Sequence, residues 1–459
     1  MTAPLDSAGT ETTTAPAAAP AGAAQAPPRG APGGGRRVAW VWAVAVLIVV
    51  AALAIRIAYV DATPGMKLVD DGLDYDGHAA AIAQTGRFSD TLAYGRPTAF
   101  RPPAYPYLLG AVYRVSGVGD APVARRVVVA RRLQIVISTV LVAMIGLLAA
   151  QLWGSVVALA AMGLAAVYVP LVTMSGSVMS EPLFAVLMLG SLSAAIAHRR
   201  STHRWRWAVL SGLLVGLAIL TRANALILLL PLALAVWNLR PRWSVRGLGP
   251  PVALVLVAVL AVVPWTVRNY RTLHHFVPVS TQLGSALAGT YNDEARTDKL
   301  RPASWRSLRR VPSYADIFSR VREANEAVLE KQLRHRAERY ALDHPLYVGQ
   351  VAFWTTVRGL DLDGMSWSRH TAGTVSIDTP WADRGVWCFW LFALLAVAGA
   401  FTAAARRAPW FVWAFPALMY LSVVFLVIET PRYRTPLDPF IVILAALALV
   451  AAGRRLARR

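Results

Sequence analysis

The sequence predicts an all-α polytopic membrane protein, and its composition, hydropathy and apolar runs all support this class. Of the 459 residues, 56% are hydrophobic and only 15% are charged. The mean hydropathy of the chain is +0.48. Several apolar stretches reach the roughly 18–20 residues that an α-helix needs to cross a bilayer, whereas a transmembrane β-barrel would show shorter segments of alternating polarity.

The chain is expected to begin with a tail and then to cross the membrane about ten times. Residues 1–37 are expected to form a disordered cytoplasmic tail, because residues 1–35 are rich in Ala, Pro, Thr and Gly and carry almost no large apolar side chains. Residues 38–459 are expected to form one transmembrane domain. The expected spans are about 38–60, 128–150, 154–173, 178–197, 207–222, 223–239, 249–270, 385–404, 409–428 and 436–453.

Loop charges predict the orientation of these spans. The acid-free basic loops 198–206 and 240–246, and the basic residues 454–459, fall on one side, which the positive-inside rule assigns to the cytoplasm. Both chain termini are then cytoplasmic, and two long polar loops, 61–127 and 271–384, are extracytoplasmic. We therefore expect a multi-pass plasma-membrane protein with its functional surface outside the cytoplasm.

Both long loops are expected to carry amphipathic helices. Pro102 and Pro103 suit the first turn of a short helix that lies on the outer leaflet. In residues 313–347 the apolar positions fall mainly at helical spacing, which predicts an amphipathic helix that ends near Pro345.

Composition also argues against two classes of function. The net charge of +21 would suit a nucleic-acid partner, but the positive-inside loops account for the basic residues, so no such partner is expected. The single cysteine, Cys388, lies in an apolar run, so an intramolecular disulfide is impossible and redox chemistry is not favoured.

An unusual group of acids directly follows the first expected span: Asp70, Asp71, Asp74 and Asp76. If a helix starts near Asp71, then Asp71, Asp74, Tyr75 and His78 share one face. Helix capping would account for one or two of the acids. It accounts poorly for four, and polar groups held against a membrane are usually functional, so the pattern favours a functional carboxylate.

Further charges are expected at the outer ends of the spans: Glu181, Arg222, Arg268, Arg271, Glu429, Arg432 and Arg434. Any one of them alone could be an interface anchor. Together they place arginines on the face where the orientation rule does not require them. Arginine binds phosphate bidentately, so arginines with a few carboxylates at one membrane surface suit a lipid-phosphate substrate and a proton-transfer step.

Six segments occur in an order that resembles bacterial GT-C glycosyltransferases: "DDGLDYDGHAAAIAQTG", "RPPAYPYLLG", "SEPLF", "GLAILTRANAL", "PWTVRNY…FVPVSTQLG" and "ETPRYRTPLDPF". The resemblance is to the family 39-like group, which is related to protein O-mannosyltransferases and to the transferase that adds aminoarabinose to lipid A. It covers essentially everything from residue 38 onward.

This resemblance implies the GT-C fold and a hexosyl- or pentosyltransferase. Such an enzyme takes a sugar from a polyprenyl-phosphate donor in the membrane and transfers it, with inversion, to an extracytoplasmic glycan, lipid or protein. The family's Asp-x-x-x-Tyr pattern falls on Asp71 and Tyr75, which implies that Asp71 is catalytic and Asp70 its neighbour. Because Asp70–Asp71–Gly72 departs from the commoner Asp-Glu pair, a shift of one position remains open. Arg101 takes the place of the lysine in the family's Lys-Pro-Pro.

Chemistry agrees with these implied roles. A general base must take the proton of the acceptor hydroxyl as an oxocarbenium-like transition state forms, and partial desolvation is expected to raise the basicity of Asp71. The leaving phosphate needs positive charge rather than an acid. The first candidates for that charge are Arg268, Arg432 and Arg434, and Arg101 and Arg222 are the second choice. A divalent cation such as Mg or Mn, shared by Asp71 and Glu181, is a further option because hard cations take oxygen ligands.

The alternative is a polytopic transporter or flippase for a polyprenyl-linked or anionic lipid. Transporters place substrate-binding charge near the midplane of the bilayer and often show repeat symmetry. Here the charges gather at the outer ends of spans, and no internal repeat is visible. We therefore favour the enzyme.

Overall fold

The fold is known from a computed structural model, which describes residues 33–90, 95–237, 245–319, 324–425 and 430–458. Within these ranges the regular structure is helical, and the β-type pairing is one isolated bridge between Ser89 and Pro97. The all-α class that the sequence predicts is therefore confirmed. Most of the expected tail lies outside the described residues.

Ten helical segments stand where ten spans are expected. Seven are long and apolar enough to cross a membrane: α1 (Gly33–Asp61), α4 (Val123–Trp153), α7 (Glu181–Arg200), α8 (Arg204–Thr221), α10 (Gly249–Leu273), α17 (Thr379–Ala400) and α20 (Asp438–Leu456). Three are shorter: α5 (Ser155–Val167), η1 with α9 (Ala223–Val236) and α19 (Trp410–Val424).

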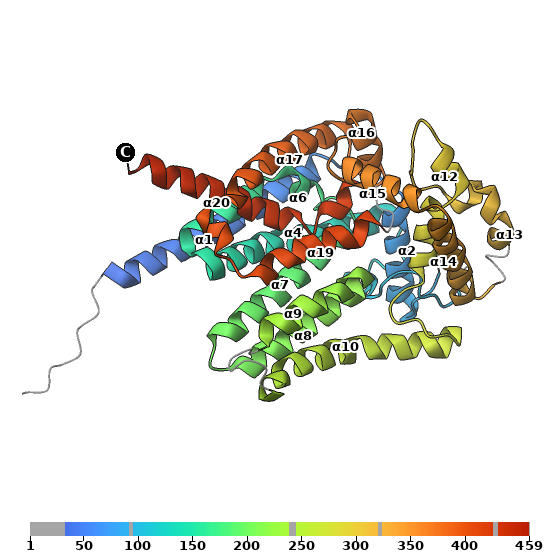
Figure 1. Cartoon of the computed structure of the whole chain (residues 1–459), viewed down its shortest axis with the longest axis horizontal. Coiled ribbons are helices and arrows are strands. Elements are labelled where there is room, and N and C mark those ends of the chain that lie inside the picture. The colour runs from blue at the N-terminus through green and yellow to red at the C-terminus, as the bar shows by residue number, and fades with distance from the viewer. Residues whose placement is uncertain (1–32, 91–94, 238–244, 320–323, 426–429, 459) are drawn as a thin grey trace, which may run out of the picture.

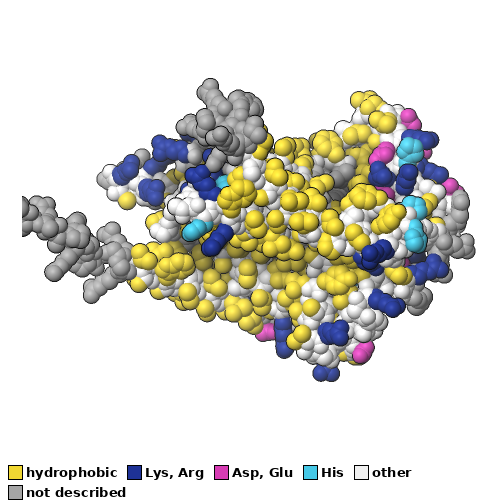
Figure 2. Space-filling view, turned by 90° about the horizontal axis from the view of Figure 1, so that it is seen from below, with side chains coloured by type: hydrophobic (Ala, Val, Ile, Leu, Met, Phe, Trp, Pro, Cys, Tyr) yellow, Lys and Arg dark blue, Asp and Glu magenta, His cyan; other side chains and the backbone are white. Residues whose placement is uncertain are grey.

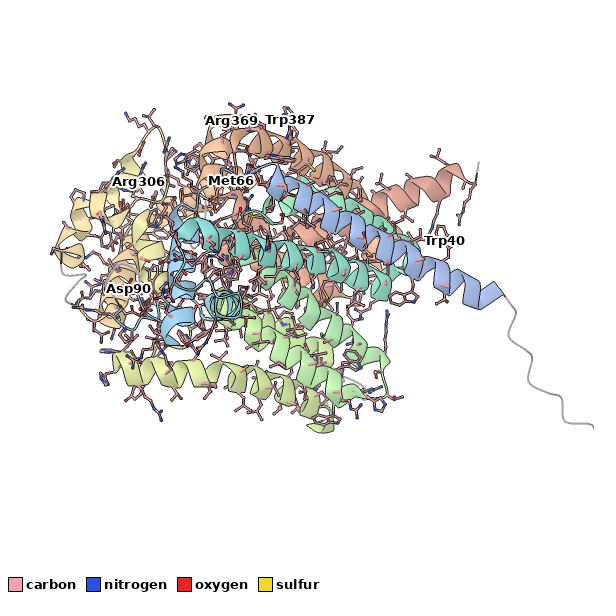
Figure 3. The ribbon with its side chains drawn as sticks, turned by 180° about the vertical axis from the view of Figure 1, so that it is seen from behind. Trp40, Met66, Asp90, Arg306, Arg369 and Trp387 are labelled. Carbon is pink, nitrogen blue, oxygen red and sulfur yellow. The ribbon has the colours of Figure 1, made fainter. Side chains whose placement is uncertain are left out.

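The helices of the two polar loops gather at one end of this bundle, and the C-terminus lies at the other end (Figure 1). These helices are α2 (Asp70–Thr85), α3 (Ala104–Val115), α11 (Gln282–Thr290), α12 (Asp293–Thr297), α13 (Ala315–Phe318), α14 (Glu326–Asp343), α15 (Pro345–Gly359) and α16 (Met365–Gly373). We call this the loop end of the bundle. Met66, Asp90 and Arg306 lie toward the loop end, whereas Trp40 lies toward the opposite end of α1 (Figure 3).

The surface of the molecule agrees with a membrane setting. Hydrophobic side chains cover the middle of the face in Figure 2, and lysines and arginines gather toward its two ends. Trp40 and Trp387 are 68% and 71% exposed on α1 and α17. Large apolar side chains that face outward along a bundle are expected where the surrounding solvent is lipid.

The sequence prediction for residues 313–347 needs a correction, because the structure has several helices there rather than one. The short α13 is followed by α14 and then by α15, which begins at Pro345. Asn325 caps α14, and its side chain accepts a hydrogen bond from the Ala327 N–H at 3.0 Å. A capping asparagine starts a new helix, so the apolar periodicity of the sequence extends over more than one helix here.

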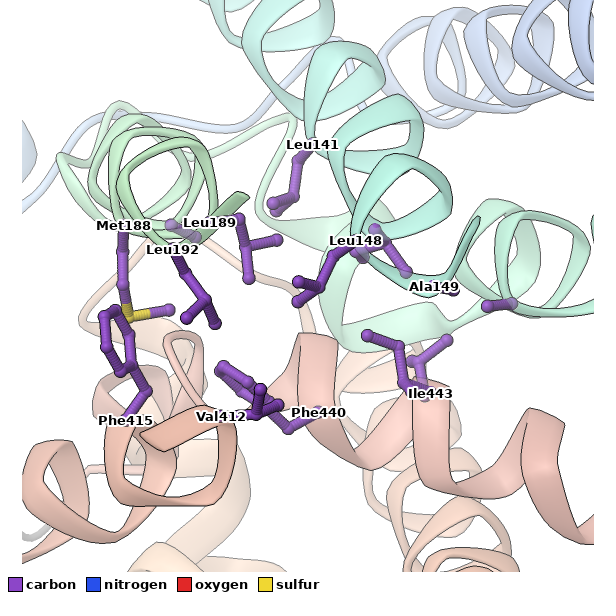
Figure 4. Packing of buried hydrophobic residues seen from close by; sticks show 14 of the residues in the cluster. Leu141, Leu148, Ala149, Met188, Leu189, Leu192, Val412, Phe415, Phe440 and Ile443 are labelled. Atoms are coloured by element: carbon purple, nitrogen blue, oxygen red, sulfur yellow. The ribbon is translucent and has the colours of Figure 1, made fainter. Parts of the chain in front are cut away.

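Close helix contacts hold the bundle together. Leu148, Leu192, Phe415 and Phe440 meet in its largest apolar cluster, which joins α4, α7, α19 and α20 (Figure 4). A Cβ added at Gly399 of α17 would lie only 1.9 Å from the Leu444 carbonyl oxygen of α20. Small residues at such crossings allow two backbones to approach, which is the usual means of helix association in membranes.

Candidate active site

The four aspartates of α2 have different settings. Helix α2 begins at Asp70, which is exposed and has a φ of 42°, a left-handed conformation that aspartate tolerates. Asp71 and Asp74 are only partly exposed. Asp76 is buried and accepts a hydrogen bond from Arg126 of α4 at 2.5 Å. Asp76 therefore ties α2 to the bundle, while Asp71 and Asp74 belong to a second group of charges.

Two arginines from distant segments hold the carboxylate of Asp71. Its Oδ1 accepts a hydrogen bond from Nη2 of Arg101 at 2.5 Å, and its Oδ2 accepts one from Nη2 of Arg432. Arg101 also donates from Nε to Oδ2 of Asp74 at 2.5 Å. One guanidinium thus bridges Asp71 and Asp74, as their spacing of three residues on a helix allows.

Glu181 is the second carboxylate that arginines hold. It lies at the start of α7, is 2% exposed, and pairs with Nη1 of Arg222 at 3.0 Å. The Nε of Arg432 lies 3.8 Å from the same oxygen of Glu181. Tyr75 approaches from α2, and its hydroxyl lies 3.1 Å from the Oγ of Ser180.

We call these charged groups the arginine–carboxylate cluster: Asp71, Asp74, Arg101, Glu181, Arg222 and Arg432. With its three arginines and three carboxylates, the cluster is formally neutral. Five segments that are distant in the sequence supply it: α2, the residues before α3, the start of α7, the residue after α8, and η5 (Pro431–Arg434). Every member is a residue that the sequence singles out.

Sequence analysis missed Tyr433, which completes the cluster. The guanidinium carbons of Arg222 and Arg432 lie 4.7 Å and 4.6 Å from the centre of its ring. Nη2 of Arg432 also donates to the Tyr433 hydroxyl at 2.7 Å. Such stacking orients both arginines. The only signal in the sequence is an aromatic residue between the two arginines of "PRYR".

The pKa of Asp71 is lowered in this cluster, whereas the sequence led us to expect a raised one. Burial by itself would raise the pKa of Asp71, but the charges and hydrogen bonds of Arg101 and Arg432 outweigh it and hold the pKa well below its usual range. Asp71 is therefore an ion in this arrangement. The sequence-based expectation that desolvation raises its basicity is wrong for this state of the cluster, because the two arginines contribute the larger effect.

Arg432 keeps one free donor next to a pocket. Its Nε is buried and has no hydrogen-bond acceptor among the residues that the structure describes. The pocket has a volume of about 70 Å³, with Arg432 and Arg434 in its polar wall. Its other wall is mostly apolar and includes Pro170, Met174, Val375, Ile377, Trp381 and Val386.

Two predicted phosphate ligands, Arg268 and Arg434, have partners outside the arginine–carboxylate cluster. Arg268 donates to the carbonyl oxygens of Thr98 and Phe88 at 2.6 Å and 2.8 Å. Arg434 pairs with Asp361 at 2.9 Å and with Asp438 at 3.3 Å. In the described chain, neither arginine has a hydrogen bond or ion pair with Asp71 or Glu181. Glu429 lies outside the described residues.

The cluster is a poor match for the divalent cation that the sequence leaves as an option. Asp71 and Glu181 share Arg432 as a partner, and each has a further arginine. A Mg or Mn ion between them would lie against positive charge, with its oxygen ligands already engaged. Among the described residues there is also no group of three or more His, Cys, Asp or Glu side chains that could hold a metal ion.

A buried glutamate positions the segment that carries Arg101. Glu326, the first residue of α14, accepts hydrogen bonds from the Thr98 hydroxyl at 2.6 Å and from the Ala99 N–H at 2.5 Å. Burial raises the pKa of Glu326 above its ordinary value, although both hydrogen bonds act in the opposite direction. Its negative charge therefore destabilises the fold while its hydrogen bonds stabilise it.

We expect Glu326→Gln to make the protein more stable than wild type at neutral pH. The glutamine amide oxygen can accept from Ala99 and its NH2 group can donate to Thr98, so both contacts persist without the charge. The pKa of Glu326 is higher in the folded protein than in the unfolded chain. Protonated Glu326 therefore stabilises the folded state below the unfolded-state pKa, and this stabilisation is lost as the pH rises through the folded-state pKa. Unfolding temperatures of both proteins, measured from acid to neutral pH, should agree at the acid end and diverge above it.

Glu338→Gln on the exposed side of the same helix is the matched control, and it should not raise the unfolding temperature at neutral pH. A Glu326→Gln protein that is less stable than wild type at neutral pH, or a difference that does not change with pH, would contradict this account of Glu326.

Known proteins match the chain in part of its sequence. Residues 100–267 match a family model described as dolichyl-phosphate-mannose-protein mannosyltransferase. This segment is less than half of the chain and contains Arg101, Glu181 and Arg222, but not Asp71 or Arg432. No curated protein is significantly similar to the chain in sequence.

The whole fold resembles an archaeal oligosaccharyltransferase, AglB from Archaeoglobus fulgidus. A structure of AglB with an inhibitory peptide and a dolichol-phosphate gives a TM-score of 0.56 at 15% identity, covering 92% of this chain and 51% of that chain. A structure of the same organism's enzyme tethered to an acceptor peptide gives 0.54 at 13% identity, covering 91% and 50%. This chain therefore spans about half the length of those proteins.

A third match is weaker. The structure of ArnT from Cupriavidus metallidurans bound to undecaprenyl phosphate is 16% identical and covers 91% of this chain and 78% of that chain, but its TM-score is 0.38. The shared fold is thus established by AglB. This chain therefore shares the fold of AglB, and residues 100–267 are similar in sequence to the mannosyltransferase family model.

Proposed function

We propose that the chain transfers a sugar from a polyprenyl-phosphate donor to the hydroxyl of an extracytoplasmic glycan, lipid or protein. The observation that carries this proposal is the arginine–carboxylate cluster at the loop end, where Asp71 lies between Arg101 and Arg432. The family model names a dolichyl-phosphate sugar donor, and AglB is a glycosyl-transferring enzyme seen with dolichol-phosphate. Both relationships favour a lipid-phosphate donor for this chain.

Arg432 is the proposed main ligand of the donor phosphate, with Arg222 beside it. The Nε of Arg432, which has no hydrogen-bond acceptor among the described residues, offers a donor to a phosphate oxygen, and Tyr433 keeps both guanidinium planes in place. A guanidinium can bind phosphate through two parallel hydrogen bonds. The apolar wall next to Arg432 gives the first isoprene units of the lipid a surface to pack against.

Binding of the phosphate is proposed to activate Asp71. A phosphate that binds Arg432 offsets the positive charge beside Asp71 and adds negative charge nearby, which raises the pKa of Asp71 from its depressed value. The acceptor hydroxyl oxygen then bonds to the anomeric carbon, and the bond from that carbon to the phosphate oxygen breaks. The hydroxyl proton passes to Asp71, and polyprenyl phosphate leaves with the bonding electrons, so the anomeric configuration inverts.

The location of the charges favours this enzyme over a transporter. The cluster residues lie in the loop helix α2, at the start of α7, directly after α8 and in η5, and therefore at the ends of spanning helices rather than midway along them. A transporter for the same lipid would need its binding charges near the midplane.

The direct test of the phosphate site is ligand-induced stabilisation. Undecaprenyl phosphate added to the purified protein should raise its unfolding temperature, because a ligand that binds only the folded state at about 100 times its Kd contributes about 2.7 kcal/mol. Undecaprenol, which has the same tail without the phosphate, should raise it much less. Equal stabilisation by the two lipids would contradict a phosphate site.

The proposed orientation has its own test. Two variants are made in a Cys388→Ser background, one with cysteine in place of the exposed His203 and one with cysteine in place of the exposed Leu300. An impermeant thiol reagent added to intact cells should label position 300 and should reach position 203 only after the cells are permeabilised. The reverse pattern would place the arginine–carboxylate cluster in the cytoplasm and contradict the extracytoplasmic site.

A further inference from the structure

A groove lies on the outside of the bundle, between the end of α3 and the start of α4. Its volume is about 560 Å³. Two arginines and several aliphatic side chains line it: Val112, Val118, Arg125, Val128, Val129, Arg132, Leu133 and Val136, with Ser116 as a further polar residue. The groove shares no lining residue with the arginine–carboxylate cluster or with its pocket.

The length of α4 places this groove at the depth of lipid headgroups. The helix has 31 residues, so it is about 46 Å long at 1.5 Å per residue, whereas the hydrocarbon core of a bilayer is about 30 Å thick. Its four arginines all lie between Val123 and Arg132, and the remainder up to Trp153 has none. The arginine-bearing start of α4 is therefore the part that extends beyond the hydrocarbon.

The four arginines divide into two pairs with different partners. Arg126 binds Asp76 of α2 at 2.5 Å, and Arg131 binds the Thr63 hydroxyl at 2.6 Å. Arg125 and Arg132 are exposed instead, and in the described chain their side chains have no ion pair or hydrogen bond. Seven residues separate them, so they lie two turns apart on one helix face.

Exposed valines share this face with the two free arginines. Val128 is 50% exposed and Val136 is 55% exposed, and both line the groove. A surface that combines unpaired cations with exposed aliphatic side chains, at the boundary between hydrocarbon and headgroups, matches a molecule with an anionic head and an apolar chain. A soluble anion would use the arginines but not the valines.

We infer that this groove binds an anionic phospholipid of the surrounding leaflet. The lipid phosphate lies between the guanidinium groups of Arg125 and Arg132, and one acyl chain lies along Val128, Leu133 and Val136.

The test measures lipid binding by the full-length protein. Native mass spectrometry of the purified protein, titrated with phosphatidylglycerol or phosphatidylcholine, should show tighter retention of phosphatidylglycerol. The double variant Arg125→Gln/Arg132→Gln should lose about tenfold or more of that affinity, since each arginine near a membrane surface strengthens binding to anionic lipid severalfold. Arg125→Lys/Arg132→Lys keeps both charges and should retain most of it.

A matched control removes two other exposed arginines, which do not line the groove, in Arg87→Gln/Arg271→Gln, and should bind phosphatidylglycerol as wild type does. Equal losses in the two Gln variants would show a general charge effect and overturn the site. Equal retention of both lipids by wild type would overturn it too. Displacement of the lipid by millimolar inorganic phosphate would identify a site for a soluble anion instead.

Discussion

Replacing Asp71 by asparagine is expected to lower sugar transfer by about 10²–10⁴-fold, the usual contribution of a general base. Asparagine keeps the shape of the side chain and one oxygen that can accept a hydrogen bond from Arg101 or Arg432, but it cannot take the proton of the acceptor. Asparagine also caps helices about as well as aspartate does, so α2 should still form. Turnover is measured with a labelled donor, and donor affinity separately by ligand-induced stabilisation.

Asp70→Asn is the matched control for this variant. Asp70 adjoins Asp71 but is exposed, and its φ of 42° suits asparagine as well as aspartate. Its turnover should be close to that of wild type. Near-normal turnover of Asp71→Asn would refute the catalytic assignment, and loss of turnover in Asp70→Asn alone would show that the catalytic position is one residue earlier.

Replacing Arg432 by lysine is expected to weaken binding of polyprenyl phosphate by about tenfold or more. Lysine keeps the charge but loses the planar guanidinium. In arginine, that group contacts Asp71 and Tyr433 through Nη2 while its Nε can still donate to a phosphate oxygen. Arg268→Lys is the matched control. Because Arg268 donates to the carbonyl oxygens of Thr98 and Phe88 and does not line the pocket next to Arg432, that change should lower the unfolding temperature with little effect on lipid affinity.

Arg432→Gln adds a test of the electrostatics. It removes one of the two charges that depress the pKa of Asp71, so that pKa should rise. The acid limb of the pH profile of kcat/KM reports groups of the free enzyme and should move to higher pH in this variant. An unchanged acid limb would show that Asp71 is not the group that titrates. Unchanged lipid affinity in Arg432→Lys would assign Arg432 a structural role.

Much of the fold could be predicted from the sequence, because lipid imposes simple rules. A spanning helix needs about 20 apolar residues, and seven of the expected spans are long apolar helices in the structure, while the runs at Ser155–Val167, Ala223–Val236 and Trp410–Val424 form shorter ones. The break between α13 and α14 could not be seen, since helical periodicity continues across a capping residue such as Asn325.

The candidate site was only partly predictable, for a geometric reason. The sequence indicates how far along a span a charge lies, but not where it lies around the bundle. Arg222 and Arg432 therefore looked the same as Arg268 and Arg434, although only the first two reach Glu181. The depressed pKa of Asp71 was equally hidden, because its partners are 30 and 361 residues away in the chain.

The most direct measurement of the central claim is donor turnover by the purified full-length protein. The protein is incubated with a panel of polyprenyl-phosphate sugars, and release of polyprenyl phosphate is followed for wild type, Asp71→Asn and Asp70→Asn. The proposed function predicts that wild type and Asp70→Asn consume at least one donor of the panel and that Asp71→Asn does not. Consumption of that donor by Asp71→Asn at the wild-type rate would contradict the claim that the carboxylate between Arg101 and Arg432 performs the proton transfer.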